Sequence, residues 1–484
     1  MINVPARRSG PVVLSGAPAL LTLFGTPRHG FCDGLARRSF LRIGALGTGA
    51  LGTGALGLPS AQFSPASQAE TTPTRSVIMV YLPGGPTQHE TFDPKPNAPA
   101  EIRGSYSPIA TSLPGVQFCE LLPKLSSMAH RFSIIRTLVG MQNRHESFQC
   151  YTGRPGGRPG DMEPAGGWPT FGSVASLVLG PGRQGMLPYV DAAPKMGYGP
   201  YNNRGLHDAS GKVSWPGFTG RSHIPLALEG DVQSDLVLNG IDPARFDHRR
   251  KLLAALRRRE ASGQSDTVTS FQQRAFGLLT SSRLAEALDL EREDPRTLER
   301  YGKTQKTDPS FGGAPQSPKH LLLARRLVEV GVRCVTVSFG AWDWHANREG
   351  SIEYLSRKYL PAFDHALSVF LDDLHQRGLS DHVTVVVWGE FGRTPRINAK
   401  GGRDHWPGTQ SVLITGGGLQ PGQIVGTTDP SGGRPVDRPV HVQEVFATLY
   451  QRLGIDVNQI KIPDLNGRPR YLVEANRRPI RELG

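Results

Sequence analysis

Several short segments of this chain combine a histidine with a carboxylate, which suits metal binding or proton transfer. The first is GAWDWHAN, residues 340–347, which contains Asp343 and His345. In extended chain the side chains of residues i and i+2 share a face, so Asp343 and His345 can converge on one point. A carboxylate and an imidazole that converge are suitable ligands for zinc, manganese or iron.

Two later segments carry similar residues. GEFGRTP, residues 389–395, contains Glu390 and Arg393, and GGRDHWP, residues 401–407, contains Asp404 and His405. The carboxylates and the histidine are further candidate metal ligands. Arg393 has the planar fork of N–H groups that binds phosphate or sulfate, so we expect it to stabilise negative charge on such a group.

Two earlier segments supply candidates for acid–base chemistry. TQHETFDPK, residues 87–95, contains His89, and NRHES, residues 143–147, contains Asn143 and His145. An imidazole titrates near neutral pH, so His89 or His145 could act as general base or as acid for the leaving group. Each segment alone also has a structural explanation, because loop Asp residues cap helices and loop His residues bond locally.

The elements between these segments predict an α/β fold. Apolar, β-branched runs that end in Gly or polar residues predict buried strands at 76–82, 132–138, 332–339, 383–388 and 411–415. Helical patterns lie at 116–130, 318–331, 352–377 and 441–453. This alternation predicts a doubly wound, mostly parallel sheet with helices on both faces. The loops beyond the carboxyl ends of its strands would then bring the candidate residues together.

We expect a single domain over residues 70–475 with two insertions. Residues 151–240 are rich in Gly, Pro and Asn and predict a long loop-rich insertion, and residues 241–317 predict a helical one. The helical insertion carries Arg clusters at 249–251 and 257–259. A helix packed by its Leu residues with solvated Arg explains them better than a polyanion-binding helix.

The first 61 residues have the pattern of a twin-arginine export signal. Arg37 and Arg38 precede Phe40 and a Gly/Ala-rich apolar run that extends to Leu58. A membrane anchor is the alternative, but the run is short and rich in Gly. The expected location is therefore periplasmic or extracellular, with no membrane span in the mature chain.

The charge and the cysteine content bear on nucleic-acid binding and on disulfide formation. The formal net charge is +13, and residues 1–61 carry six Arg and one Asp, so the mature chain has a net charge of +8. Export and the lack of a basic, aromatic-rich motif disfavour nucleic-acid binding. Cys119, Cys150 and Cys334 remain in the mature chain without CxxC spacing, which leaves buried thiols, or one disulfide with a free thiol, as the alternatives.

The candidate segments together resemble a known family. LPGGPTQHETFDPKP, NRHESFQCYTG, WDWHAN, GEFGRTPRIN and GRDHWP resemble the bacterial secreted family catalogued as domain of unknown function 1501, and so does the leader FCDGLARRSFLRIGALG. That family is grouped with the alkaline phosphatase and sulfatase superfamily. The resemblance implies a doubly wound α/β fold in which Asp and His at strand ends bind two metal ions. It also implies a nucleophilic side chain that attacks a phosphate or sulfate ester.

Residue by residue, the resemblance implies that Asp343 and His345 form a metal-binding pair and that His405, beside Asp404, is a later ligand. Glu390 stands where the superfamily usually has Asp. The chain departs from the superfamily at Gly84-Gly85, where a metal-binding Asp is usual, and at Phe391, where a His is usual. Asn143-Arg144-His145 replaces the segment that carries the nucleophile. These departures disfavour a two-metal mechanism with a covalent intermediate.

Three functions follow as hypotheses. The first is an exported, metal-dependent hydrolase of phosphate or sulfate esters that uses water as nucleophile and a divalent ion such as zinc, manganese or calcium. The second is a catalytically degenerate protein that binds an anionic small molecule or a sulfated glycan. The third is an assembly partner of other envelope proteins. The first is the function that we expect.

Overall fold

The fold is built around β1 (Ser76–Tyr81), a strand whose six residues are all buried. It pairs in parallel with β7 (Cys334–Ser338) on one side and with β8 (Val383–Trp388) on the other. All three strands are buried along their whole length and rich in apolar, β-branched residues, as expected for strands covered on both faces. The computed structural model describes residues 75–145, 147–156, 165–193, 216–228, 248, 251–252, 282–304, 313–346 and 350–484.

Nine strands form the central sheet, in the order β12-β4-β11-β8-β1-β7-β5-β6, with β15 paired to β4. The further strands are β4 (Ser133–Val139), β5 (Tyr189–Asp191), β6 (Leu226–Ala227), β11 (Gln410–Gly416), β12 (Ile424–Val425) and β15 (Val440–His441). The mostly parallel sheet predicted from the sequence is confirmed. Only β11 runs antiparallel to its neighbours, β4 and β8, among these strands. β11 therefore begins at the edge where β8 ends, which brings the segment before β11 to that edge.

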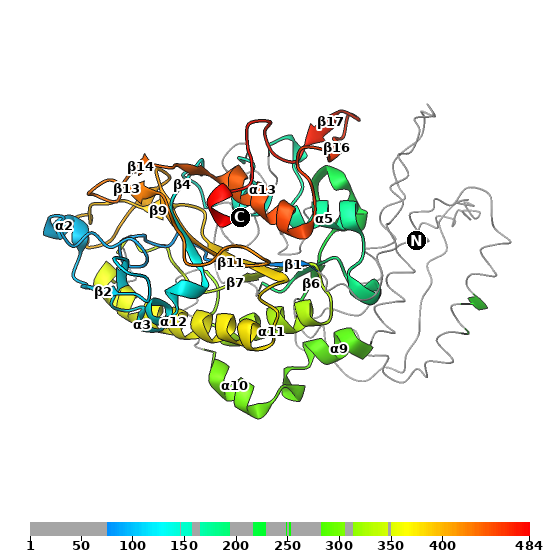
Figure 1. Cartoon of the computed structure of the whole chain (residues 1–484), viewed down its shortest axis with the longest axis horizontal. Coiled ribbons are helices and arrows are strands. Elements are labelled where there is room, and N and C mark those ends of the chain that lie inside the picture. The colour runs from blue at the N-terminus through cyan, green and yellow to red at the C-terminus, as the bar shows by residue number, and fades with distance from the viewer. Residues whose placement is uncertain are drawn as a thin grey trace, which may run out of the picture. The chain divides into compact units, whose positions relative to one another are not determined.

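Helices cover both faces of the sheet, as predicted. Ile78 and Val80 of β1 pack into one core cluster, and Val77 and Met79 pack into the other. The first face is covered by α3 (Pro123–Ser127), α11 (Pro318–Glu329) and α12 (Ile352–Gln376), and the second by α5 (Phe171–Leu179) and α13 (Val442–Leu453). Figure 1 shows α11 and α12 below the sheet and α13 above it. No helix among the described residues is long and apolar enough to cross a membrane.

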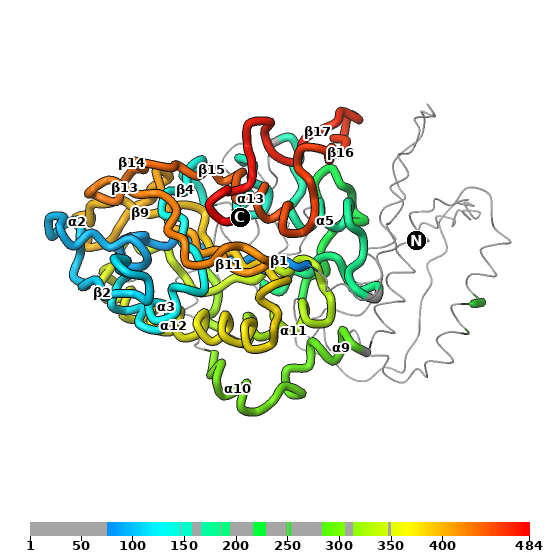
Figure 2. The backbone as a smooth tube through the Cα atoms, viewed as in Figure 1, coloured from blue at the N-terminus to red at the C-terminus, as the bar shows by residue number. Residues whose placement is uncertain are grey.

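Chain segments that are distant in sequence lie together at the carboxyl edge of the sheet. β1 pairs with β8, and β8 pairs in turn with β11, both of which come late in the chain. In Figure 2 the blue β1 segment accordingly lies close to the orange β11. Short two-stranded sheets lie outside the central sheet: β2 (Pro108–Ala110) with β3 (Gln117–Cys119), β9 (Gly392–Arg393) with β10 (His405–Trp406), β13 (Thr427–Thr428) with β14 (Pro435–Asp437), and β16 (Lys461–Pro463) with β17 (Pro469–Tyr471). A short helix, α2 (Ala100–Arg103), precedes them.

Some segments differ from the sequence-based expectation. The helix expected over 116–130 is instead β3 followed by α3, because Pro123 has no backbone N–H, suits the first turn of a helix and disfavours its extension toward residue 116. The expected 151–240 insertion supplies α5 and the strands β5 and β6 of the central sheet. These strands have only three and two residues, so they leave no periodic signal.

Almost all described residues belong to one compact unit, residues 61–237 with 277–484. The expected export signal, residues 1–61, lies outside the described residues, and so does most of the expected helical insertion. The described part of that insertion contains α9 (Ser282–Leu288) and α10 (Pro295–Tyr301). Cys119, Cys150 and Cys334 are buried free thiols, so among the described cysteines no disulfide forms.

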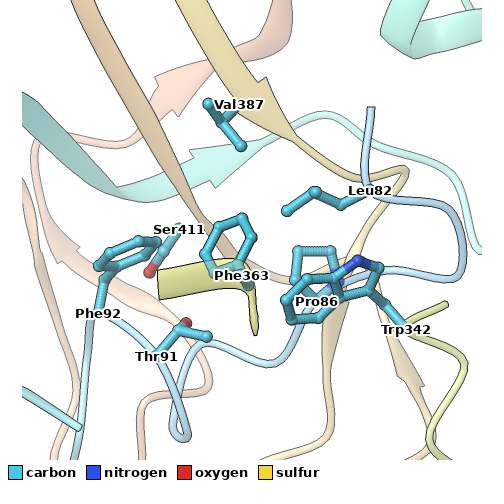
Figure 3. A pocket seen from close by; sticks show the side chains of 8 residues that line it. All are labelled: Leu82, Pro86, Thr91, Phe92, Trp342, Phe363, Val387 and Ser411. Atoms are coloured by element: carbon cyan, nitrogen blue, oxygen red, sulfur yellow. The ribbon is translucent and has the colours of Figure 1, made fainter. Parts of the chain in front are cut away.

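A small cavity lies within the core beneath the strand ends. Figure 3 shows the eight side chains that line it: Leu82, Pro86, Thr91, Phe92, Trp342, Phe363, Val387 and Ser411. Its volume is about 10 Å³, which is no more than a single water molecule needs. This cavity is therefore a packing defect in the core and is too small for a substrate.

Candidate metal centre

The loop after β7 presents Asp343 and His345 on one face. Trp342 and Trp344 alternate with them and are fully buried, with their rings stacked 5.2 Å apart. Each indole N–H donates to a backbone carbonyl, of Phe339 and Ala341 respectively, at 2.8 Å. The two tryptophans therefore fix this loop to the core, and the predicted alternation places Asp343 and His345 together.

Asp343 lies at the centre of a cluster of four residues, His145, Asp343, His345 and His405, called the metal cluster below. One potential ligand atom from each residue lies within 4.8 Å of those of the other three. The Nε2 atoms of His145, His345 and His405 are 3.5, 3.0 and 3.3 Å from an Asp343 carboxylate oxygen. His145 follows β4, and His405 lies on β10, directly before β11. The antiparallel direction of β11 is thus what brings His405 to the other ligands.

A different oxygen atom holds the second ring nitrogen of each histidine. His145 Nδ1 is 2.8 Å from Glu390 Oε1, and His345 Nδ1 is 2.8 Å from Asp404 Oδ1. His405 Nδ1 is 2.9 Å from the side-chain oxygen of Asn143.

A carboxylate or amide oxygen can only accept, so each Nδ1 carries a proton and donates it. A proton on Nε2 can then donate to Asp343, and where a bound metal ion displaces that proton the Nε2 lone pair is directed toward the centre of the metal cluster. This is the arrangement in which outer carboxylates orient metal-binding histidines.

The pKa values reflect the mutual contacts of the metal cluster. Burial alone would raise the pKa of Asp343, but hydrogen bonds with the three histidines hold it well below its usual range. Burial opposes the charged form of His145, yet hydrogen bonds with Asp343 and Glu390 raise its pKa to about 9. The hydrogen bond with Asp343 raises the pKa of His345, whereas burial lowers that of His405. Asp343 is therefore ionised over the whole physiological range.

The donor set fits a divalent ion of borderline softness. Three imidazole nitrogens and one carboxylate oxygen match the ligands that zinc accepts, and a four-coordinate ion would place them about 3.4 Å apart. The ligand atoms lie within 4.8 Å of one another, so binding requires only a small inward movement. Calcium prefers six to eight oxygen ligands and suits this set poorly.

Glu390 and Asp404, both expected to be ligands, lie behind the histidines instead. Glu390 is 2% exposed, and its oxygens accept from the Tyr81 hydroxyl at 2.9 Å and from the Gly84 N–H at 2.8 Å, besides His145. Asp404 also accepts from the Asn398 amide at 3.1 Å. Sequence reasoning missed Tyr81 and Asn398; the only signal for Tyr81 is its place as the last residue of β1.

Arg393 is placed next to Asp343, with Nη2 2.6 Å from Oδ1. Its guanidinium is fully buried and also donates to the carbonyl oxygens of Gly84, Gly85 and Arg403. The N–H groups expected to bind a phosphate or sulfate are thus directed at the protein. Gly84, one of the departures from the superfamily, has φ +107° and packs so closely on Asp343 that a Cβ atom would lie 2.3 Å from its nitrogen.

His89 lies away from the metal cluster. It is 2% exposed, and its Nε2 donates to the carbonyl of Ser431 at 2.7 Å. Burial is the main reason that its pKa falls to about 4, and the nearby Arg403 lowers it further. A neutral imidazole in this position stabilises the contact between the 87–93 and 429–433 loops. The structure therefore assigns it a packing environment and gives it no contact with the other candidates.

Comparisons with known proteins identify one family and several solved structures with low similarity to this chain. No curated protein matches the chain. Similar solved structures include the PsFucS1 sulfatase from Pseudoalteromonas sp. (11% identity, 80% of this chain and 69% of that chain, TM-score 0.35). They also include the lipoteichoic acid synthase LtaP from Listeria monocytogenes (11%, 79% and 72%, 0.32) and the phosphonate monoester hydrolase SpPMH from Silicibacter pomeroyi (10%, 85% and 76%, 0.31). Because the model of the family described as "Protein of unknown function (DUF1501)" matches residues 74–483, which is most of the chain, this protein belongs to that family.

Proposed function

We propose that this protein is an exported, metal-dependent hydrolase of phosphate or sulfate esters. The observation that carries the proposal is the metal cluster itself, in which three Nε2 atoms and one carboxylate converge. Structural histidines in a core need no such convergence, since one local hydrogen bond satisfies each of them. Export rests on the sequence pattern at residues 37–58 and remains part of the proposal.

His145, Asp343, His345 and His405 would hold the ion. A divalent ion in such a site supplies Lewis acidity to an ester oxygen and lowers the pKa of water. Glu390, Asp404 and Asn143 keep the three imidazoles in the Nδ1–H tautomer, so that each Nε2 stays available as a ligand.

Packing and exposure give the metal cluster a closed and an open side. The ring of Phe391 packs on His405 at 4.4 Å and on His145 at 5.2 Å, which excludes water from that side. The side chain of Asp404 is 54% exposed, so the metal cluster borders solvent on the Asp404 side. An ester would therefore approach beside Asp404.

The test combines metal binding with ester turnover. Purified protein is stripped with chelator, titrated with Zn²⁺ or Mn²⁺ by calorimetry, and assayed on aryl phosphate, phosphonate and sulfate esters. We expect His345→Ala to weaken metal binding by on the order of 100-fold or more and to abolish turnover. Glu390→Gln is expected to weaken binding by about 10- to 100-fold, as outer-shell changes do.

His375→Ala removes an exposed histidine of α12 and serves as the matched control, with both properties unchanged. Wild-type protein that folds but binds neither ion would contradict the proposal.

A second candidate is anion or sulfated-glycan binding without turnover. The observation that favours it is the commitment of the Arg393 N–H groups to the protein, which leaves the expected charge stabiliser without a donor for the substrate. Metal binding with saturable binding of a sulfated glycan, and no product from any ester, would select this candidate.

A further inference from the structure

The Arg393 guanidinium is a buried cation in direct contact with two residues of the metal cluster. Its side chain has no exposed surface, Nη2 is 2.6 Å from Asp343 Oδ1, and Nη1 is 3.4 Å from His345 Nε2. In the β9–β10 pair, Arg393 is also the cross-strand partner of His405. A permanent positive charge therefore stands beside the ligands.

An oxygen-lined cage surrounds this guanidinium. Its Nε donates to the carbonyl of Gly85 at 2.9 Å, and its two Nη atoms donate to the carbonyls of Arg403, at 3.1 Å, and Gly84. Together with Asp343 Oδ1, these carbonyls form the kind of oxygen set that a hard metal cation would otherwise bind.

Gln88 fixes the backbone of Arg393 through hydrogen bonds to both its N–H and its carbonyl oxygen. Gln88 Oε1 accepts from its N–H at 2.9 Å, and Gln88 Nε2 donates to its carbonyl at 2.8 Å. With its backbone fixed, the guanidinium cannot leave the cage without leaving the buried carbonyl oxygens of Gly84, Gly85 and Arg403 without a donor.

Formal charges around the metal cluster accommodate one divalent ion. Among the described residues that contact its histidines, the carboxylates of Asp343, Glu390 and Asp404 are negative and Arg393 is positive. Metal binding requires neutral imidazoles, so in the metal-bound state two negative charges remain, which one divalent ion balances. A second divalent ion would create an excess of buried positive charge beside the guanidinium, which is strongly unfavourable at low dielectric constant.

We propose that the Arg393 guanidinium is a fixed internal cation that limits the metal cluster to one divalent ion. The proposal rests on the proposed function, because it requires that the metal cluster binds an ion. Arg393 is then a positioning residue: it holds one oxygen of Asp343 and occupies the cage in which a second ion would otherwise lie.

The test is the number of ions bound, measured by native mass spectrometry and by equilibrium dialysis with Zn²⁺ and Mn²⁺. We expect one ion in the wild type at saturating metal and one in Arg393→Lys, which keeps the positive charge. We expect two in Arg393→Gln, where the vacated cage can bind a second ion. Electron paramagnetic resonance of the Mn²⁺ forms should change from the signal of an isolated ion to that of a coupled pair.

Two ions in the wild type would overturn the inference, and that measurement does not depend on any variant folding. One ion in folded Arg393→Gln, as judged by circular dichroism and thermal unfolding, would overturn it as well. Neither result affects the proposed hydrolase. Failure of the wild type to bind any ion would instead remove the proposed function, and the inference with it.

Discussion

At the scale of single residues, hydrogen-bond partners separate the roles of chemically similar side chains. His145 and His405 are both held through Nδ1 and face Asp343 through Nε2, whereas His89 contacts a backbone carbonyl and is buried elsewhere. Glu390 accepts from three donors and has no oxygen directed at the centre of the metal cluster. Position in the network, more than residue type, decides which groups can bind an ion.

A substitution at Gly84 tests whether metal binding requires the close approach of the loop after β1 to Asp343. Gly84→Ala places a Cβ atom 2.3 Å from Asp343 N at φ +107°, so Asp343 must shift. We expect metal affinity to fall at least ~10-fold and the free energy of unfolding to fall by about 3 kcal/mol. Calorimetric Zn²⁺ titration and urea unfolding measure the two effects.

Gly115→Ala is the matched control, because Gly115 also has positive φ (+76°) but no atom within 4 Å of the added carbon. Its cost should be about 1–2 kcal/mol of backbone strain with unchanged metal affinity. Equal losses of metal affinity in the two variants would show that close packing on Asp343 is unimportant.

At the scale of elements, buried charges join the helices on one face of the sheet. Arg325 of α11 is 1% exposed and contacts Asp373 of α12 at 3.0 Å and Glu293, which precedes α10, at 2.6 Å. Arg377 at the end of α12 also contacts Glu293 at 3.0 Å. These contacts fix α10, α11 and α12 relative to one another beneath the strands that carry the metal cluster.

Removing the buried Arg325 cation should lower the free energy of unfolding far more than removing an exposed arginine. Arg325→Met leaves Glu293 and Asp373 buried with less compensation, and we expect the free energy of unfolding to fall by about 3–5 kcal/mol. Arg357→Met is the control: Arg357 is exposed and pairs with Glu353 one turn away, so its loss should lower the free energy of unfolding far less than the loss of Arg325. Denaturant unfolding followed by circular dichroism compares them, and similar losses would argue against a network that joins the helices.

At the scale of the whole molecule, loops from distant parts of the chain bury polar groups where they meet. His89 connects the loop after β1 to the loop between β13 and β14. Next to it, Glu90 forms a buried ion pair with Arg403 at 2.6 Å. The stability of the molecule should therefore respond to the protonation of His89.

The sign of this response follows from the lowered pKa of His89, about 4 against 6.5 for an ordinary imidazole. Between these values the unfolded chain binds a proton that the folded protein does not, so the stabilisation present above pH 6.5 is lost as the pH falls. From pH 7 to pH 5 the wild type should lose about 2 kcal/mol more than His89→Gln. Urea unfolding at both pH values measures this difference, and parallel losses in the two proteins would contradict it.

The sequence by itself determined the fold class, the five main strands, three of the four long helical patterns and the spacing that joins Asp343 to His345. These features are local: apolar runs, helical periodicity and i, i+2 geometry express themselves within a few residues. Only the tertiary structure decided that β11 runs antiparallel and brings His405 to His145, that Glu390 and Asp404 stand behind the histidines, and that Arg393 faces Asp343. Those outcomes depend on hydrogen bonds between residues tens to hundreds of positions apart. Spacing along a chain carries no information about such partners, because strand direction and loop packing set which side chains meet.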